Sequence, residues 1–195
     1  MGNAVFNGGI ATILLALLAS PSLADGPSEA ALSQTCNGCH GWNGVSQGES
    51  IPSIAGLNAD FMTKAMEQFK EGRRSATIMD RIAKGYKTYE LRKVARYFSR
   101  QPWVRVDTPL DSALVARGQA LHERHCAECH EDSGRYQDKD VPRLAGQRPN
   151  YLFIQLTKYA NKEPKMPQPS DMADKLGAVE LSDLPALSAF YSSVE

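Results

Sequence analysis

The sequence predicts an all-α protein made of two tandem copies of one helical unit. Apolar residues recur at helical spacing, and no stretch shows the alternation of a half-buried strand. The motif "CNGCH" at 36–40 returns as "CAECH" at 126–130, an offset of 90 residues. The same offset relates "PSIAG" at 52–56 to "PRLAG" at 142–146. Self-similarity at a fixed period indicates a repeated structural unit, here of about 80 residues.

The N-terminal 24 residues differ from the rest and predict a signal peptide over 1–24. An apolar run covers 10–19, which is too short for a membrane-spanning helix of roughly 20 residues. Ser22 and Ala24 form a small-x-small cleavage site, although no Lys or Arg precedes the apolar run. A buried N-terminal helix is the alternative. We therefore expect a mature chain that starts near Asp25, has no membrane span and works in the periplasm.

The repeat also predicts the domain boundaries. The first domain covers 25–101 and the second covers 111–195, with a linker over 102–110 that contains Pro102 and Pro109. The 22 basic and 22 acidic residues balance, so the composition gives no indication of a nucleic-acid partner.

Each unit is expected to contain three helices. The first runs into the cysteine motif, over 28–36 and 112–126, and the second carries an apolar face that begins near Phe61 or Tyr151. The third has apolar positions at i, i+3, i+4 and i+7 in the first unit: Leu91, Val94, Ala95 and Phe98. The second unit gives Leu184, Leu187, Ser188 and Tyr191 at an offset of 93, so three residues are added between Tyr159 and Leu184.

Three chemistries compete for the cysteines, which are Cys36, Cys39, Cys126 and Cys129. A redox-active Cys-x-x-Cys dithiol usually starts a helix of an α/β fold, and the sequence shows no strands to build one. Four cysteines in an exported chain suggest two disulfides, and two Cys-x-x-Cys pairs suggest a zinc site. Neither explains why His40 and His130 directly follow the motifs. Cys-x-x-Cys-His is the attachment motif of c-type haem, because two thioether bonds fix the porphyrin beside an imidazole that can coordinate the iron. Two copies in one exported chain predict two covalently bound haem c groups.

His40 and His130 are the predicted axial ligands on one face of each iron, and methionines are the candidates for the other face. Met79 lies nine residues before Thr88, where the third helix begins, and Met172 lies nine residues before Leu181. Met79 and Met172 differ by the offset of 93 that the third helices require. Met166 is the alternative for the second haem, while Met62 and Met66 are expected to line the haem pocket. Methionine ligation raises the reduction potential and closes the last coordination site.

Two further sets of residues lie near the predicted haems. His122 and His125 fall on the proximal side of the second haem, and we expect them on the polar surface of the first helix. Pro52 and Pro142 follow His40 and His130 by twelve residues. Their carbonyl groups could accept the second N–H of each ligating imidazole, or the prolines could belong to simple turns.

The chain resembles diheme class I cytochromes c over nearly its whole mature length. More narrowly, "SATIMDRIAKGY", "ARYFSRQ", "LAGQRPNYL", "DMADKL" and "ALSAFYSS" resemble the cytochrome subunit of flavocytochrome c sulfide dehydrogenase. The resemblance implies two domains related by a pseudo-twofold axis with haems facing one another. It also implies Met79 and Met172 as axial ligands and the carbonyls of Pro52 and Pro142 as histidine partners.

The same resemblance implies the partners. A flavoprotein subunit with covalently bound FAD would oxidise sulfide, and this chain would pass the electrons to a soluble acceptor cytochrome c. The first haem would lie nearest the flavin. The chain itself has no Gly-rich dinucleotide motif, so FAD is expected on the partner subunit only and no catalytic residue is expected here.

Two other functions stay open at the level of sequence. One is a free-standing diheme cytochrome that shuttles electrons to a terminal oxidase or reductase. The other is a haem enzyme or gas sensor, which would need an open coordination site and is disfavoured if both methionines bind. A permanent subunit should bury a large apolar patch, for which Trp42, Trp103 and Tyr86 are candidates, although each could instead pack against the haem or anchor the linker.

Overall fold

The computed structural model describes residues 1–2 and 26–195. The predicted signal peptide and its cleavage site lie outside the described residues. Residues 26–195 form helices joined by loops and contain no β-strand, as the sequence predicts. No helix among them has the length and apolar content needed to cross a bilayer.

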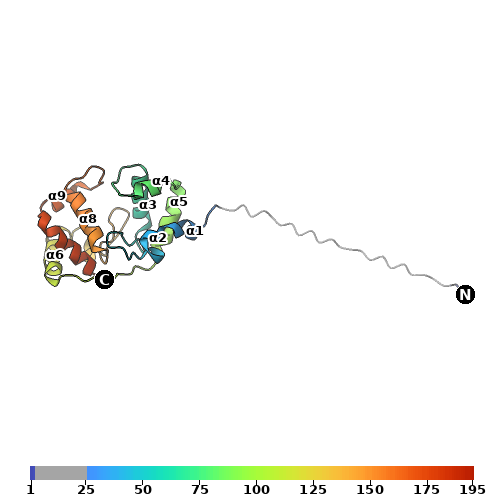
Figure 1. The fold of residues 1–195 in the computed structure, drawn as a ribbon, viewed down its shortest axis with the longest axis horizontal. Coiled ribbons are helices and arrows are strands. Elements are labelled where there is room, and N and C mark those ends of the chain that lie inside the picture. The colour runs from blue at the N-terminus through green and yellow to red at the C-terminus, as the bar shows by residue number, and fades with distance from the viewer. Residues whose placement is uncertain (3–25) are drawn as a thin grey trace.

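The first copy contains five α-helices, of which three are short, and two 3-10 turns around the cysteine motif (Figure 1). In order these are α1 (Glu29–Ser33), η1 (Gln34–Cys36), α2 (Asn37–His40), η2 (Trp42–Gly44), α3 (Ala59–Lys70), α4 (Met79–Lys84) and α5 (Thr88–Ser99), so that α4 and α5 follow the two turns of the motif region. The Ser28 hydroxyl caps α1 by accepting the N–H of Ala31 at 3.1 Å. The short helix α4, which carries Met79, is not among the three helices predicted for each unit.

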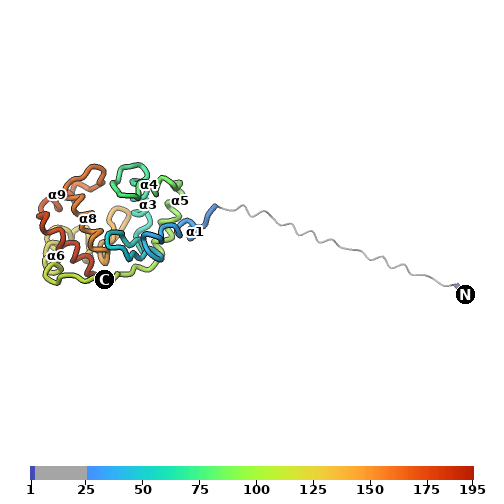
Figure 2. Tube along the Cα trace, viewed as in Figure 1, coloured from blue at the N-terminus to red at the C-terminus, as the bar shows by residue number. Residues whose placement is uncertain are grey.

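The second copy repeats this order with a longer first helix (Figure 1). Its elements are α6 (Ser112–His125), α7 (Glu131–Gly134), α8 (Pro149–Ala160), α9 (Ser170–Gly177), η3 (Leu181–Asp183) and α10 (Leu184–Ser193). The helix-free segment over 100–111 joins the copies and runs along the lower edge of the tube in Figure 2. The three added residues fall between α8 and α10, where α9 has eight residues and α4 has six.

The internal repeat is visible in the hydrogen bonds of the loop that follows each cysteine motif. The carbonyl of Gly44 accepts two backbone N–H groups, and the carbonyl of Gly134 does the same 90 residues later. The donors are Ile54, Ala55, Leu144 and Ala145, at 2.8 to 3.1 Å. Gly44 and Gly134 have φ of 84° and 85°, a backbone conformation that side chains disfavour. The repeated glycine therefore makes the same turn at this point of both loops.

Each copy has its own apolar core, which the third helix provides in large part. Leu91, Val94, Ala95 and Phe98 are all buried, as the predicted spacing requires, and Leu184, Leu187, Ser188 and Tyr191 are buried in the second copy. In the second copy α10 packs most extensively against α6, whereas in the first copy α5 packs against both α1 and α3. The predicted apolar faces of the third helices are therefore confirmed.

Glutamine side chains of the second copy bind the backbone of the first. Gln147 is 3% exposed; its Oε1 accepts the N–H of Ser53 at 2.8 Å and its Nε2 donates to the Ser53 carbonyl at 2.9 Å. Gln137 makes the same kind of pair, with the N–H of Asn58 at 2.8 Å and the carbonyl of Gly56 at 2.9 Å. These paired bonds fix the two cysteine-motif loops relative to one another.

Replacing Gln147 by Leu, the residue at the corresponding position 57 of the first copy, should destabilise the protein. The buried N–H and C=O of Ser53 would lose their partners, and each unsatisfied buried group costs about 1–3 kcal/mol, so we expect a loss of about 2–4 kcal/mol. Denaturant unfolding of the purified protein measures it. Gln137→Leu is the matched control with a smaller expected loss, because its bonds are only partly buried. Equal losses in the two variants would contradict the role of burial.

Candidate haem sites

The four cysteines lie at the ends of the first helices, where each pair has one inner and one outer member. Cys36 and Cys126 are partly buried and pack against the two apolar cores, whereas Cys39 and Cys129 are exposed. Burial raises the pKa of Cys36 and of Cys126. None of these four described cysteines forms a disulfide. One thiol of each pair therefore lies against the core and the other faces solvent.

His40 is held in the orientation expected of a metal ligand. Its Nδ1 lies 2.8 Å from the carbonyl oxygen of Pro52, so this nitrogen donates its proton there and Nε2 is left with the lone pair. Burial lowers the pKa of His40, although the hydrogen bond to Pro52 opposes that shift. The imidazole is thus neutral at neutral pH, which is the form that binds a metal ion.

His130 has a similar environment but lacks the corresponding hydrogen bond. Desolvation, with a smaller contribution from nearby His122, lowers the pKa of His130 to about 4. Its Nδ1 is shielded from solvent and has no hydrogen-bond partner among the described residues. The expected bond to the carbonyl of Pro142 is therefore not formed in this structure.

The difference between the two histidines follows from the residue after each motif. Gly41 has φ of 75°, and a Cβ atom there would lie 2.0 Å from the carbonyl oxygen of Val45. Glu131 occupies this position in the second copy and cannot take the same conformation at low cost. The left-handed residue there is instead Asp132, with φ of 49°. The loop after His130 consequently takes another path, and the Pro52 contact of the first copy is not reproduced.

The two candidate distal ligands lie on corresponding short helices. Met79 is the first residue of α4 and Met172 is the third residue of α9, and both are half-buried. Ala83 lies one turn after Met79, and Leu176 lies one turn after Met172; both are buried. Residues four apart share a helix face, so each methionine is on the inward face of its helix.

The remaining methionines occupy different surroundings. Met62 is 8% exposed and belongs to the core cluster of the first copy, and Met66 is half-buried on the same helix. Met166 is half-buried in the loop after α8, beside Lys165, whose carbonyl accepts the N–H of Ser75 at 2.7 Å. Met166 therefore sits where a loop of the second copy contacts the first.

The expectation for His122 was wrong. This residue is 4% exposed, and its Nδ1 lies 2.9 Å from the hydroxyl of Tyr191. Burial lowers the pKa of His122. Helical spacing places residue 122 among polar neighbours, but α10, 69 residues away in sequence, covers it. His125 is half-buried at the end of α6.

Of the three aromatic residues considered for a partner surface, one is fully exposed. Trp42 is 73% exposed, whereas Tyr86 is half-buried with its hydroxyl 2.6 Å from Thr35 Oγ1. Trp103 packs against the first core, and the guanidinium of Arg143 lies 4.9 Å from its ring centroid. Trp103 thus anchors the joining segment to both copies.

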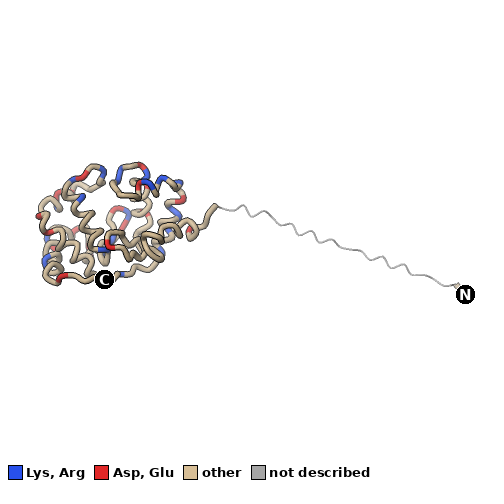
Figure 3. The backbone as a smooth tube through the Cα atoms, in the orientation of Figure 1, with Lys and Arg blue, Asp and Glu red and all other residues tan. Residues whose placement is uncertain are grey.

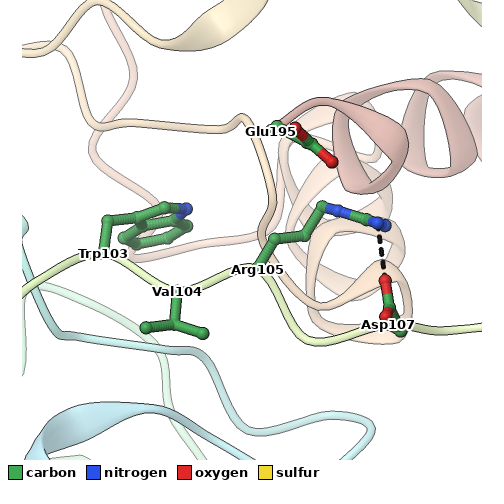
Figure 4. Close-up of a pocket in the computed structure, with 5 residues that line it drawn as sticks. All are labelled: Trp103, Val104, Arg105, Asp107 and Glu195. Atoms are coloured by element: carbon green, nitrogen blue, oxygen red, sulfur yellow. Dashed lines mark hydrogen bonds and ion pairs between the residues drawn. The ribbon is translucent and has the colours of Figure 1, made fainter.

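A surface pocket beside Trp103 is not part of either cysteine site. It has a volume of about 420 Å³ and is lined by Trp103, Val104, Arg105, Asp107 and Glu195 (Figure 4). Arg105 and Asp107 form an ion pair at 2.5 Å within it. The pocket lies between the joining segment and the C-terminal residue, and its lining has neither a thiol nor an imidazole.

The residues at both motifs fit a covalently attached haem. Each copy presents two free thiols two residues apart, one against the core and one at the surface. A neutral imidazole follows directly, and the orphaned Nδ1 of His130 marks a buried polar atom in a site otherwise closed by apolar side chains. A half-buried thioether lies on a separate short helix of each copy. Thiol, imidazole and thioether are the donor set of a His/Met c-type haem.

Comparison with curated proteins gives relatives of one kind. The chain is 30% identical over 160 residues to cytochrome c4 of Pseudomonas aeruginosa, a match that covers 75% of this chain and 78% of that protein. It is 26% identical over 209 residues to the thiosulfate dehydrogenase electron acceptor of Stutzerimonas stutzeri, covering 95% and 93%. It is 45% identical over 67 residues to the cytochrome subunit of sulfide dehydrogenase of Chlorobaculum tepidum, covering 34% and 60%.

Comparison with solved structures gives the same fold. The structure of reduced recombinant cytochrome c4 from Pseudomonas stutzeri superimposes with a TM-score of 0.76 at 24% identity, over 87% of this chain and 100% of that one. This likeness confirms the predicted all-α fold with two domains. No family model matches the sequence.

Proposed function

Because the chain belongs to the diheme class I cytochromes c of the cytochrome c4 kind, with covalent haem c and an electron-transfer function, we propose that it is the electron-accepting subunit of a periplasmic sulfide-oxidising flavoprotein complex. The single observation that carries the proposal is the 45% identity over 67 residues to the cytochrome subunit of a sulfide dehydrogenase. This identity exceeds the 30% shared with cytochrome c4, although it spans a shorter part of the chain.

We assign the residues at each haem as follows. Cys36 and Cys39 hold the first haem, and Cys126 and Cys129 hold the second. His40 and His130 would each supply an imidazole ligand to the iron of their haem, and Met79 and Met172 would each supply a thioether ligand. The carbonyl of Pro52 orients His40, and Pro142 has the corresponding role only if the loop after His130 rearranges around the haem. Each bound haem supplies a one-electron couple.

The protein residues set the properties of that couple. Thioether ligation favours the reduced iron and so raises the potential, which suits a chain that accepts electrons. The hydrogen bond to Pro52 holds the neutral imidazole of His40 in one tautomer, and burial keeps the imidazole of His130 neutral. If both methionines bind, neither iron would keep a coordination position open for substrate. Two one-electron sites can accept both electrons of a two-electron donor such as a reduced flavin, and FAD belongs to the partner subunit.

The surface of the first copy supports a docking site for the flavoprotein. Ile78 and Ile82, on either side of Met79 along α4, are 51% and 44% exposed, and Trp42 is more exposed still. Lys and Arg are interspersed with Asp and Glu along the backbone of both copies (Figure 3), and their numbers balance over the chain, so net charge gives little long-range steering of a transient partner. Apolar contact is therefore the better basis for a lasting complex.

Coexpression with the flavoprotein subunit tests the proposal. We expect the two chains to co-purify and sulfide to reduce both haems, with electrons passing on to a soluble cytochrome c. Ile82→Gln should slow sulfide-dependent haem reduction roughly tenfold at limiting flavoprotein, the effect of losing one well-packed contact residue. Leu181→Gln, which changes a residue 58% exposed in the second copy, is the matched control and should have no effect. A cytochrome that stays oxidised with sulfide and flavoprotein would refute the proposal.

A free-standing carrier is the second candidate. Matches over 75% and 95% of the chain to cytochrome c4 and to a thiosulfate dehydrogenase electron acceptor favour it. This function predicts a protein that purifies alone, accepts no electrons from the flavoprotein and reduces a terminal oxidase or reductase. Adding thiosulfate and a thiosulfate-oxidising enzyme in place of sulfide separates the two donors in the same assay.

A further inference from the structure

The second copy buries a polar pair of side chains where the first copy has an apolar pair. His122 lies in α6 at the position equivalent to Leu32, 90 residues earlier, and Tyr191 lies in α10 at the position equivalent to Phe98, by the offset of 93. Both members of the pair differ together between the copies. The internal repeat thus serves as its own comparison, because in both copies the helix before the cysteine motif packs against the third helix.

The pair is fully enclosed and geometrically defined. His122 and Tyr191 are 4% and 1% exposed, and His122 Nδ1 lies 2.9 Å from the Tyr191 hydroxyl. The Phe190 ring covers the imidazole, with ring centroids 5.1 Å apart. Placing a histidine and a phenol at the crossing of two helices costs desolvation free energy that an apolar pair avoids. A buried polar pair at such a position calls for a functional reason.

The Tyr191 hydroxyl faces the attachment site of the second haem. Cys126 packs against the core cluster that contains Tyr191, and the Tyr191 hydroxyl, acting as a donor near the sulfur, opposes the rise that burial causes in the pKa of Cys126. The Tyr191 ring also meets the ring of His130 edge-on, with centroids 6.5 Å apart. The pair therefore lies near both the sulfur proposed to bond the haem and the proposed proximal ligand.

The Tyr191 hydroxyl has one proton, so it can donate a hydrogen bond to only one of its two neighbours, His122 Nδ1 and the Cys126 sulfur, and its oxygen can accept one from the other. When Tyr191 donates to the Cys126 sulfur, its oxygen accepts the N–H of His122 Nδ1. Two aligned donors then point their positive ends toward the haem. A positive dipole end in a buried site disfavours the additional positive charge of the oxidised state. Phe98 and Leu32 supply no such dipole to the first haem.

We propose that His122 and Tyr191 are positioning residues that raise the reduction potential of the second haem above the value it would have with the apolar pair of the first copy. The inference rests on the haem attachment at Cys126 and Cys129 proposed above. Relative to the apolar pair of the first copy, the polar pair shifts the electron equilibrium between the haems toward the second. Electrons entering at the first copy would then move toward the second.

Tyr191→Phe tests this with a near-isosteric change to the residue found in the first copy. Spectroelectrochemical titration should show that the electron equilibrium between the haems moves about three- to tenfold away from the second, tenfold being about 59 mV for one electron. Met79→His replaces a residue of the first copy only. The step of the titration that it shifts therefore belongs to the first haem, and the other step belongs to the second. Tyr136→Phe removes an exposed phenol hydroxyl in the same copy and is the matched control, expected to leave both potentials unchanged.

Two further variants separate tuning from packing. The double variant His122→Leu/Tyr191→Phe rebuilds the pair of the first copy and should show the same loss without an orphaned polar group. His122→Gln keeps a donor near the hydroxyl and should retain most of the potential. Unchanged potentials in both Tyr191→Phe and the double variant, in a protein shown to carry two haems, would overturn this inference alone. A protein without a second haem would overturn the proposed haem sites as well.

Discussion

Replacing Met172 by Ala is expected to leave both haems attached and to lower the reduction potential of the second by roughly 0.1–0.3 V, a fraction of the span of about 0.8 V that axial ligands cover. The thioether stabilises reduced iron, and alanine supplies no replacement ligand. Met172 lies one turn before the buried Leu176 on α9, as Met79 lies one turn before the buried Ala83 on α4. The same inward placement in both copies is the structural basis of this prediction.

Met166→Ala is the matched control for Met172→Ala. Met166 lies in the loop after α8, next to the backbone contact between Lys165 and Ser75, and not on the short helix that corresponds to α4. Its loss should leave the visible spectrum and the potential of the second haem unchanged. The measurements are the sulfur-to-iron charge-transfer band and a redox titration of each variant. If Met166→Ala abolished the band and Met172→Ala did not, the ligand assignment would move to Met166.

Replacing Gly118 by Ala should destabilise the second copy by about 3 kcal/mol, the upper part of the range for overpacked sites. A Cβ atom at residue 118 would lie 2.0 Å from the carbonyl oxygen of Ala186 and 2.6 Å from Cβ of Phe190. Gly118 is thus the point of closest approach between α6 and α10, whose packing closes the core behind Cys126. The gain of about 1 kcal/mol in helix propensity on replacing glycine does not offset a clash with backbone atoms.

Gly177→Ala is the control for Gly118→Ala. Gly177 also lies within a helix of the second copy, but a Cβ atom there would meet no atom within 4 Å. It should leave stability unchanged or raise it slightly. Denaturant unfolding followed in the haem absorption band measures both variants. Equal stability of the two variants would show that α6 and α10 can separate without cost, contrary to the packing described here.

Local chemistry in the sequence predicted the haem sites and most helices. The two Cys-x-x-Cys-His motifs need only adjacent residues to be recognised, and the apolar spacing of Leu91, Val94, Ala95 and Phe98 is a property of one helix. The short helices α4 and α9 were not predicted, because six to eight residues give too little periodicity. The candidate ligand Met79 was nonetheless located by its spacing from the third helix.

Burial across distant segments could not be predicted in the same way. His122 was expected at the surface because its neighbours in sequence are polar, and only its contact with Tyr191, 69 residues away, shows that it is buried. The difference between His40 and His130 had a visible source in Gly41 and Glu131. The effect of this difference on the loop depends on backbone angles that the sequence does not display. The sequence therefore wrongly predicted a hydrogen bond from His130 to the carbonyl of Pro142.

By itself the sequence determined the covalent chemistry and the repeat: which residues can hold haem, how many times the unit occurs and which helix faces are apolar. These depend on neighbours a few residues apart, whose relative positions the helix period sets. Only the tertiary structure decided what lies against each site and how the copies meet, through Gln147 on the backbone of Ser53 and Tyr191 on His122. Such contacts join segments far apart in the chain, and packing of the whole molecule selects them.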